Sequence, residues 1–347
     1  MASWNRGLGR GNAMRDRVRN KSRLRLLLLG SAVGVVYGLA IRFSLNSNVF
    51  NWLGGAMTWA FLFGVPFAMG FITIFVIERR QALRFWVWVV WPWIPILAGA
   101  LGTLLAFLEG MICIVMFLPI ALFCASLGGI MAGVIADRLG GSKDLIAGAV
   151  LLFPLAFGPW EHHVLYSKEI HTTANYVDIH APSPVIWSNI ERVPAIRPGE
   201  LPQSWSHRIG FPNPVEATLP YEGIGGVRHA TFSGGVLFIE TIDTWEIQRR
   251  LGFSIKAQTD QIPNTTLDKH VRVGGPFFDV LHGEYRLEPL DSGVIRLHLS
   301  SQQRLSTDFN WYARIWSDAT MSALQGRILK VIGARCEREA TLRPTEN

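Results

Sequence analysis

The chain has 347 residues, of which 49% are hydrophobic and only 17% are charged, a lower charge than wholly soluble proteins carry. Three cysteines without a C-x-x-C pair exclude a disulfide framework and a cysteine-rich zinc site. The net charge of +7 is that of residues 1–25, which hold seven arginines and one lysine against one aspartate. No nucleic-acid recognition motif accompanies this charge, so we expect the segment to orient the chain at an anionic membrane surface and not to bind nucleic acid.

Five apolar stretches follow the basic tail of residues 1–23, which we expect to be cytoplasmic. They are residues 24–43, 49–77, 85–108, 110–136 and 145–160. The first four reach the roughly 20 residues that cross a bilayer, whereas the fifth is short. We therefore expect a transmembrane region of about five helices over residues 24–160. Because ionisable residues inside it are almost absent, the region favours anchoring or assembly over transport.

The loops predict the orientation of this region. Arginine and lysine gather in the tail, in residues 78–84 and in residues 137–144, whereas the alternate connections hold neither. The positive-inside rule then places the tail in the cytoplasm of a multi-pass cell-membrane protein. Five crossings put the remaining chain on the extracytoplasmic side, and four crossings would put it in the cytoplasm.

After a linker of residues 161–174, the patterns become those of an α+β domain. We expect a strand over 172–182, a helix over 183–193, a proline-rich loop over 194–220, about five antiparallel strands, and a long helix over 308–339. Gly234-Gly235 is typical of a hairpin turn. One stripe of the last helix is expected to cover the sheet. It consists of Tyr312, Ile315, Trp316, Ala319, Ala323, Ile328, Val331 and Ile332.

The stretch "VDIHAPSPVIWSNIERV" resembles the start of the START-like, or SRPBCC, superfamily of the polyketide cyclase/dehydrase type, and "FNWYARIWSDATMSALQGRILKVIGARCE" resembles its closing helix. The resemblance covers about residues 175–337, and we expect the domain to span residues 175–338 and to be followed by a disordered tail of residues 339–347. It implies a helix-grip fold, in which a curved antiparallel sheet wraps a long C-terminal helix. It also implies a second small helix near 197–222, although the prolines there leave it little room.

The resemblance implies a hydrophobic or amphipathic, lipid-like ligand in a cavity under the last helix. Some members catalyse cyclisation or dehydration in that cavity, and a structural or partner-binding role without a ligand also stays open. We favour ligand binding over catalysis. The expected partners are the lipid bilayer and a hydrophobic small molecule or lipid, and protein partners are undefined.

Glu240 is the candidate catalytic residue, as a general acid with a raised pKa. It shares one face of its strand with Phe238 and Ile242, but the opposite face, with Leu237 and Ile239, is equally apolar. Glu240 therefore faces either the cavity or the solvent.

The other candidate ligand-binding residues fall into two groups. Apolar and aromatic candidates for the cavity and its mouth are Phe253, Tyr285, Leu297, Tyr312 and Trp316. His270 and Arg272 precede a strand and could bind an anionic head group, or could belong to an exposed loop. Glu161-His162-His163 lacks a second cluster at ligand spacing, so we expect no metal site, and no motif indicates a cofactor.

Overall fold

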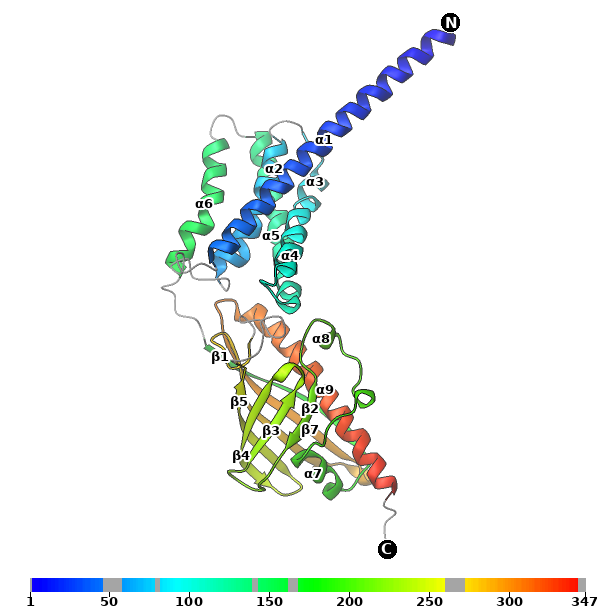
Figure 1. Cartoon of the computed structure of the whole chain (residues 1–347), viewed down its shortest axis with the longest axis vertical. Coiled ribbons are helices and arrows are strands. Elements are labelled where there is room, and N and C mark those ends of the chain that lie inside the picture. Colours follow the sequence, from blue (N-terminus) through cyan, green and yellow to red (C-terminus); the bar gives the residue numbers. More distant parts are fainter. Residues whose placement is uncertain are drawn as a thin grey trace. The chain divides into compact units, whose positions relative to one another are not determined.

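The computed structural model describes residues 2–45, 58–78, 82–138, 143–161, 168–259 and 272–342. The chain divides into two compact units. The first, Met1–Ala106 with Ile114–Leu165, is helical, and the second, Tyr166–Asn347 with Phe107–Cys113, is built on a sheet (Figure 1).

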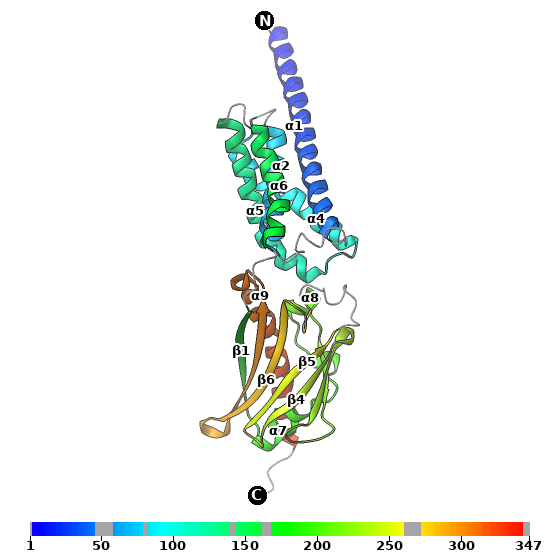
Figure 2. The ribbon, with the colours of Figure 1, turned by 90° about the vertical axis from the view of Figure 1, so that its left-hand side faces the viewer.

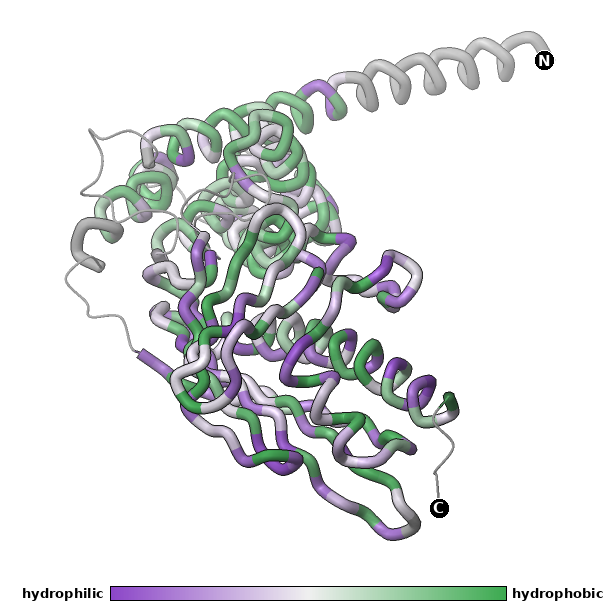
Figure 3. The backbone as a smooth tube through the Cα atoms, turned by 60° about the horizontal axis from the view of Figure 1, so that its bottom comes forward, coloured by the Kyte–Doolittle hydropathy of each residue, from purple (hydrophilic) through white to green (hydrophobic). Residues whose placement is uncertain are grey.

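Among the described residues of the helical unit, four segments are long and apolar enough to cross a membrane. Its helices are α1 (Ala2–Leu45), α2 (Val65–Glu78), α3 (Phe85–Val90), α4 (Trp93–Leu105), α5 (Met111–Arg138) and α6 (Lys143–Glu161), with a π-helical turn at Ala60–Gly64. The four spans are Ser22–Ser44, Ala60–Glu78, Phe85–Leu105 and Met111–Arg138, and the apolar part of α6 is shorter, at Asp144–Phe157. Figure 3 shows that these helices are mostly hydrophobic.

The predicted stretches differ from these helices at two places. The start of the stretch 49–77 lies outside the described residues, which resume at Thr58. The stretch 85–108 forms two helices, because a turn at Trp91 and Pro92 separates α3 from α4. Proline has no backbone N–H to donate, so it commonly stands at such a break.

Small residues let the helices of the first unit approach closely. A Cβ atom built on Gly70 of α2 would overlap the backbone of Ala125 in α5, and one built on Gly128 of α5 would overlap the backbone of Phe67 in α2. These positions tolerate no larger residue without a shift of backbone. Glycine therefore brings α2 and α5 into direct contact, as small residues do in membrane bundles.

In its described residues, the second unit is one antiparallel sheet of seven strands with three α-helices. The strands are β1 (Lys168–Ile179), β2 (Pro214–Thr218), β3 (Val227–Phe232), β4 (Leu237–Glu246), β5 (Arg250–Gln258), β6 (Phe278–Pro289) and β7 (Ile295–Ser306), in the order β1-β7-β6-β5-β4-β3-β2. The helices are α7 (Ser183–Glu191), α8 (Trp205–Arg208) and α9 (Asn310–Leu342). The sheet curls around α9 (Figure 2), so the predicted helix-grip fold is confirmed.

The sheet curls because its strands carry irregularities at defined points. The register shifts between Ile242 and Thr244 in β4 and between Val280 and His282 in β6. Such bulges increase local twist and bend a strand. The tight turn between β3 and β4 uses Gly234 and Gly235, whose φ angles of 77° and 84° suit glycine.

The proline-rich loop contains more structure than the sequence predicts. α8 forms between Pro202 and Pro212, and β2 then pairs with β3 at the sheet edge. Four residues suffice for α8, with the Ser204 hydroxyl accepting a hydrogen bond from the Ser206 amide at its start. A second small helix is therefore present where the resemblance implies one, and it has only one turn between the prolines.

The predicted apolar stripe of α9 is wrong in its N-terminal half. Ile315 is 60% exposed and Ala319 is exposed, whereas Ser317, Met321 and Gln325 are buried. In the C-terminal half, Leu329 and Ile332 pack into the main core of the sheet. The N-terminal half faces polar side chains of β1 and β7, so polar residues on α9 satisfy them.

Hydrogen bonds connect α9 to β1 and β7 in this polar region. Gln325 Nε2 donates to Thr173 O at 3.0 Å and to Ser301 Oγ at 2.9 Å, and Asn175 Nδ2 donates to Gln325 Oε1 at 2.8 Å. The hydroxyl of Ser317 donates to Gln303, which is fully buried. These directional contacts set the position of α9 along the sheet more narrowly than apolar packing alone would. α9 extends through Leu342, into the segment expected to be a disordered tail.

Candidate ligand-binding cavity

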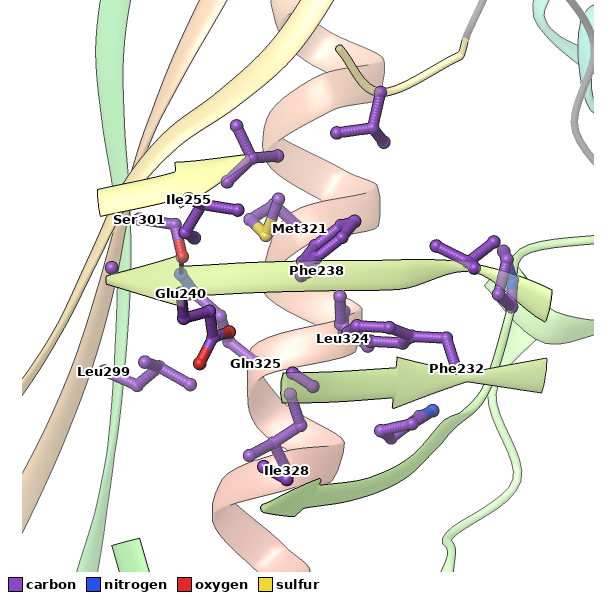
Figure 4. A pocket seen from close by; sticks show the side chains of 18 of the residues that line it. Phe232, Phe238, Glu240, Ile255, Leu299, Ser301, Met321, Leu324, Gln325 and Ile328 are labelled. Carbon is purple, nitrogen blue, oxygen red and sulfur yellow. Dashed lines mark hydrogen bonds between the residues drawn. The ribbon is translucent and has the colours of Figure 1, made fainter. Parts of the chain in front are cut away.

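A cavity of about 140 Å³ lies between the curled sheet and α9. Its apolar lining includes Phe232, Phe238, Ile255, Leu299, Met321, Leu324 and Ile328, from β3, β4, β5, β7 and α9 (Figure 4). An engineered apolar cavity of about 150 Å³ in another protein binds benzene. The space under α9 is therefore large enough for a single ring or a short acyl segment.

Glu240 and Arg228 form a buried ion pair on the cavity lining. They lie opposite each other on β4 and β3, and Arg228 Nη1 donates to Glu240 Oε2 at 2.7 Å. Glu240 is 5% exposed and Arg228 is 3% exposed. Burial raises the pKa of the Glu240 carboxyl, and the adjacent guanidinium opposes that shift. The pair places two charged groups in a mostly apolar space.

Aromatic rings hold the guanidinium of this pair. The Arg228 Cζ atom lies 5.4 Å from the centroid of the Phe253 ring and 5.9 Å from that of Tyr285. Gly283 lies opposite Phe253 in the β5–β6 register, and a Cβ atom there would meet the Phe253 ring at 2.6 Å. A larger residue at 283 would push the ring, and with it Arg228, out of position. Arg228 Nε is buried and donates to none of the described residues.

The lining also includes polar side chains of Ser301 and Thr231 from the sheet and of Gln325 from α9. Ser301 of β7 and Glu240 of β4 point into the same space as Gln325 of α9 (Figure 4). Thr231 Oγ1, also on the lining, is buried without a hydrogen-bond partner in the described part of the chain. A few polar groups in an apolar pocket are the usual means of orienting a ligand.

The proline-rich loop closes one side of the cavity through arginines of α9. Arg335 Nη2 donates to Glu200 Oε2 at 2.7 Å, and Arg335 Nη1 donates to Pro194 O at 2.9 Å. This pairing lowers the pKa of Glu200 to about 2. Arg327 also donates to the loop, at Pro202 O and Asn213 Oδ1. The loop then places Ser206, Phe211 and Pro212 on the lining.

The predicted site residues separate into three groups. Phe238, Glu240, Phe253 and Tyr285 line the cavity. Ile242 and Leu297 face the same interior but pack in the adjacent core, at 1% and 0% exposure. The remaining candidates are Tyr312, Trp316, Arg272 and His270.

Tyr312 and Trp316 are half-buried and do not line the cavity; their rings pack edge to face with centroids 6.4 Å apart. They lie in the N-terminal part of α9, where the predicted stripe fails. Arg272 is not on the lining either, and His270 lies outside the described residues. None of the histidines that the structure describes lines the cavity.

Sequence reasoning missed several residues of the site. Arg228, Thr231, Ser301, Gln325 and Arg327 all line the cavity. The turn of Ser233, Gly234 and Gly235 sets Glu240 opposite Arg228, whereas a two-residue turn at Gly234-Gly235 would have set it opposite His229, so the hairpin predicted from the sequence did not identify Arg228. Within the part of the chain that was described, no group of three or more His, Cys, Asp or Glu side chains could hold a metal ion.

No protein-family model matches the chain, and no curated protein matches it. Solved structures resemble it over about half its length. The Zhui aromatase/cyclase from Streptomyces sp. R1128 is 14% identical, covering 52% of this chain and 99% of that one at a TM-score of 0.33. A START superfamily protein from Mycobacterium smegmatis is 9% identical, covering 49% and 99% at a TM-score of 0.32. Truncated norcoclaurine synthase from Thalictrum flavum is 11% identical, covering 48% and 95% at a TM-score of 0.28. These likenesses assign neither a ligand nor a reaction to this chain.

Proposed function

We propose that the second unit is a START-like ligand-binding domain, carried by a membrane-anchored chain, that holds a small hydrophobic or amphipathic, lipid-like molecule under α9. One observation carries the proposal: the sheet and α9 leave about 140 Å³ unfilled, with an apolar lining and a few buried polar groups. Burying about 100 Å² of apolar ligand surface there would contribute about 2.5 kcal/mol before ordering costs.

Filling the cavity should abolish retention of the ligand. Ala230 lines the cavity and is 7% exposed, whereas its neighbour His229 is exposed on the other face of β3. We expect the full-length Ala230→Trp variant to co-purify with about one tenth or less of the small molecule that the wild type retains. The reason is that the indole occupies the space that the ligand needs. Mass spectrometry of organic extracts measures the yield.

The matched control for that experiment is His229→Trp, which adds the same indole outside the cavity. It should retain the ligand at the wild-type yield, and circular dichroism should show both variants folded. Equal ligand yields from the two variants would contradict the proposal. A wild type that retains no small molecule would favour the structural or partner-binding role.

Catalysis is the second candidate function, and the buried Arg228–Glu240 pair is the observation that favours it. A carboxyl whose pKa is raised by burial is suited to donate a proton to a ligand held beside it. A cyclase or dehydratase needs a base as well, and the partner beside Glu240 is an arginine, which does not deprotonate in proteins. Binding therefore remains the first proposal.

For the helical unit we propose five membrane crossings, a cytoplasmic N-terminus and an extracytoplasmic second unit. α6 has 19 residues, which span about 28 Å at 1.5 Å per residue, close to the roughly 30 Å hydrocarbon core. The arginines and lysines of the tail and of residues 78–84 and 137–144 support this orientation.

A reporter fused after Asn347 tests the number of crossings. We expect a reporter enzyme that works only outside the cytoplasm to be active there, because an odd number of spans separates the two ends of the chain. The same fusion with a reporter that works only in the cytoplasm should be silent. The reverse pattern would mean that α6 does not cross and that the second unit is cytoplasmic.

A further inference from the structure

Arg327 of α9 is a buried cation whose hydrogen bonds go to neutral acceptors. Its side chain lines the cavity and the residue is 7% exposed. Nε donates to Pro202 O at 3.0 Å and Nη1 donates to Asn213 Oδ1 at 2.6 Å. Among the described residues, no carboxylate oxygen lies within 4.0 Å of the Arg327 guanidinium, the limit for an ion pair, and Nη2 donates to no acceptor.

This environment differs from that of the other arginine on the lining. Arg228 is paired with Glu240, so its charge is compensated within the protein. Burial lowers the pKa of Arg327, the direction expected for a cation that has lost water without gaining an anion. Buried charges are ordinarily paired, because an isolated one is costly. The unpaired charge of Arg327 is thus a feature that a ligand can complete.

Two carboxylates line the cavity: that of Glu240 is paired with Arg228, and the other restricts where an anion can sit. Glu216 of β2 is on the lining and lies beyond ion-pair distance from Arg327. An anionic group in the cavity would be repelled by Glu216 and attracted by Arg327, so its favourable position is beside Arg327. Leu324 and Ile328, one turn of α9 apart, lie on the lining beside Arg327 and offer the apolar surface for the rest of the molecule.

We propose that Arg327 is the anion-recognising end of the cavity, where its guanidinium binds a carboxylate or phosphate group of an amphipathic ligand whose apolar part packs against Leu324, Ile328 and Phe232. The inference rests on the proposed ligand-binding function and specifies the class of ligand. The guanidinium is suited to this role because its N–H groups form a planar fork that matches either group, and a charge-assisted hydrogen bond is about twice as strong as a neutral one.

A purely structural role for Arg327 predicts a different outcome. Its bonds to Pro202 and Asn213 also hold the proline-rich loop against α9. If that were its only role, a substitution would weaken the binding of every ligand alike, charged or neutral. The anion role instead predicts a selective loss of charged ligands. The discriminating readout is the preference between matched ligands, not affinity for any one of them.

Three probes with the same apolar body test this preference by fluorine NMR. They are 4-(4-fluorophenyl)butanoate, 4-(4-fluorophenyl)butan-1-ol and the phosphate monoester of that alcohol, titrated with the full-length chain in lipid nanodiscs and with empty nanodiscs as the blank. We expect the wild type to bind the carboxylate or the phosphate about ten-fold more tightly than the alcohol. The stronger of the two anions identifies the chemical group that the site takes.

Arg327→Gln should abolish that preference while binding the alcohol within about two-fold of the wild type, because its amide still offers N–H donors to the loop. Arg327→Lys should restore part of the preference by restoring the charge. The control is Arg335→Gln, which alters the other loop-binding arginine of α9, one that does not line the cavity, and should keep the preference.

Two results would overturn the inference, and they are distinguishable. Equal binding of all three probes by the wild type, or a preference that survives in Arg327→Gln, overturns the anion site and leaves the ligand-binding function standing. Failure of every probe to bind, the alcohol included, overturns the proposed function and the anion site with it.

Discussion

Replacing Glu240 with alanine is expected to destabilise the sheet of the second unit by about 3–5 kcal/mol, because the substitution leaves the Arg228 guanidinium buried and uncompensated. Replacing both partners, as Arg228→Met with Glu240→Leu, should recover most of that loss, since no charge then remains inside. Hydrogen–deuterium exchange of peptides from β3, β4 and β5 in the full-length chain measures the opening free energy of these strands.

A surface carboxylate of the same strand provides the control. Glu246 of β4 pairs with Arg250, and both side chains are 43% exposed. Glu246→Ala should change the protection of β4 by less than about 1 kcal/mol, because water screens an exposed pair. If Glu240→Ala and Glu246→Ala had the same effect, the buried pair would not be a structural element of the cavity wall.

Truncating Leu329 to alanine is expected to cost about 2–5 kcal/mol and to loosen α9 from the sheet. Leu329 is 1% exposed and belongs to the main core of the second unit, so the smaller side chain leaves a void among well-packed neighbours. Ile315→Ala removes a comparable side chain from a 60% exposed position of the same helix and should change stability by less than about 0.5 kcal/mol.

Hydrogen–deuterium exchange in peptides of α9 and β7 measures the effect of both substitutions. The expected pattern is faster exchange across both elements in Leu329→Ala, because the helix and the strand share one core. Wild-type exchange in Leu329→Ala would mean that the polar contacts of Gln325 and Asn175 hold α9 in place without the apolar half.

The order of elements in the second unit could be predicted from the sequence because it rests on local signals. Alternation along β3–β7, the turn at Gly234-Gly235 and the terminal helix each depend on residues close in the chain, and together they predict a curved sheet around α9. The edge strand β2 was missed because its partner in pairing is set by tertiary structure, and its first residue is a proline.

The face of α9 was harder to predict than its existence. Hydrophobic periodicity assumes an apolar surface opposite the helix, and this holds near Leu329 and Ile332. It fails toward the N-terminus, where Thr173, Ser301 and Gln303 face α9. The polar sequence of each strand taken alone predicts that these residues face solvent. Only the long-range pairing of β1 with β7 brings them together under the helix.

Some cavity residues could be predicted from local sequence patterns, whereas others depend on long-range contacts. Phe238, Glu240, Phe253 and Tyr285 alternate along strands, so their shared face could be predicted. Arg327 and the loop residues Ser206 and Phe211 come together across more than a hundred positions of sequence. No periodicity links such segments, so they could not have been assigned to one site from the sequence alone.

The pairing of β1 with β7 has a consequence during synthesis. β1 is the first strand among the described residues, and Lys168 at its start lies opposite Ser306 at the end of β7. Both edges of β1 are therefore unpaired until β7, more than a hundred residues later in the chain, has been translated. A ribosome that stalls before β7 is complete would release a chain in which β1 is unpaired and α9 does not cover the cavity, a form that chaperones and proteases can recognise.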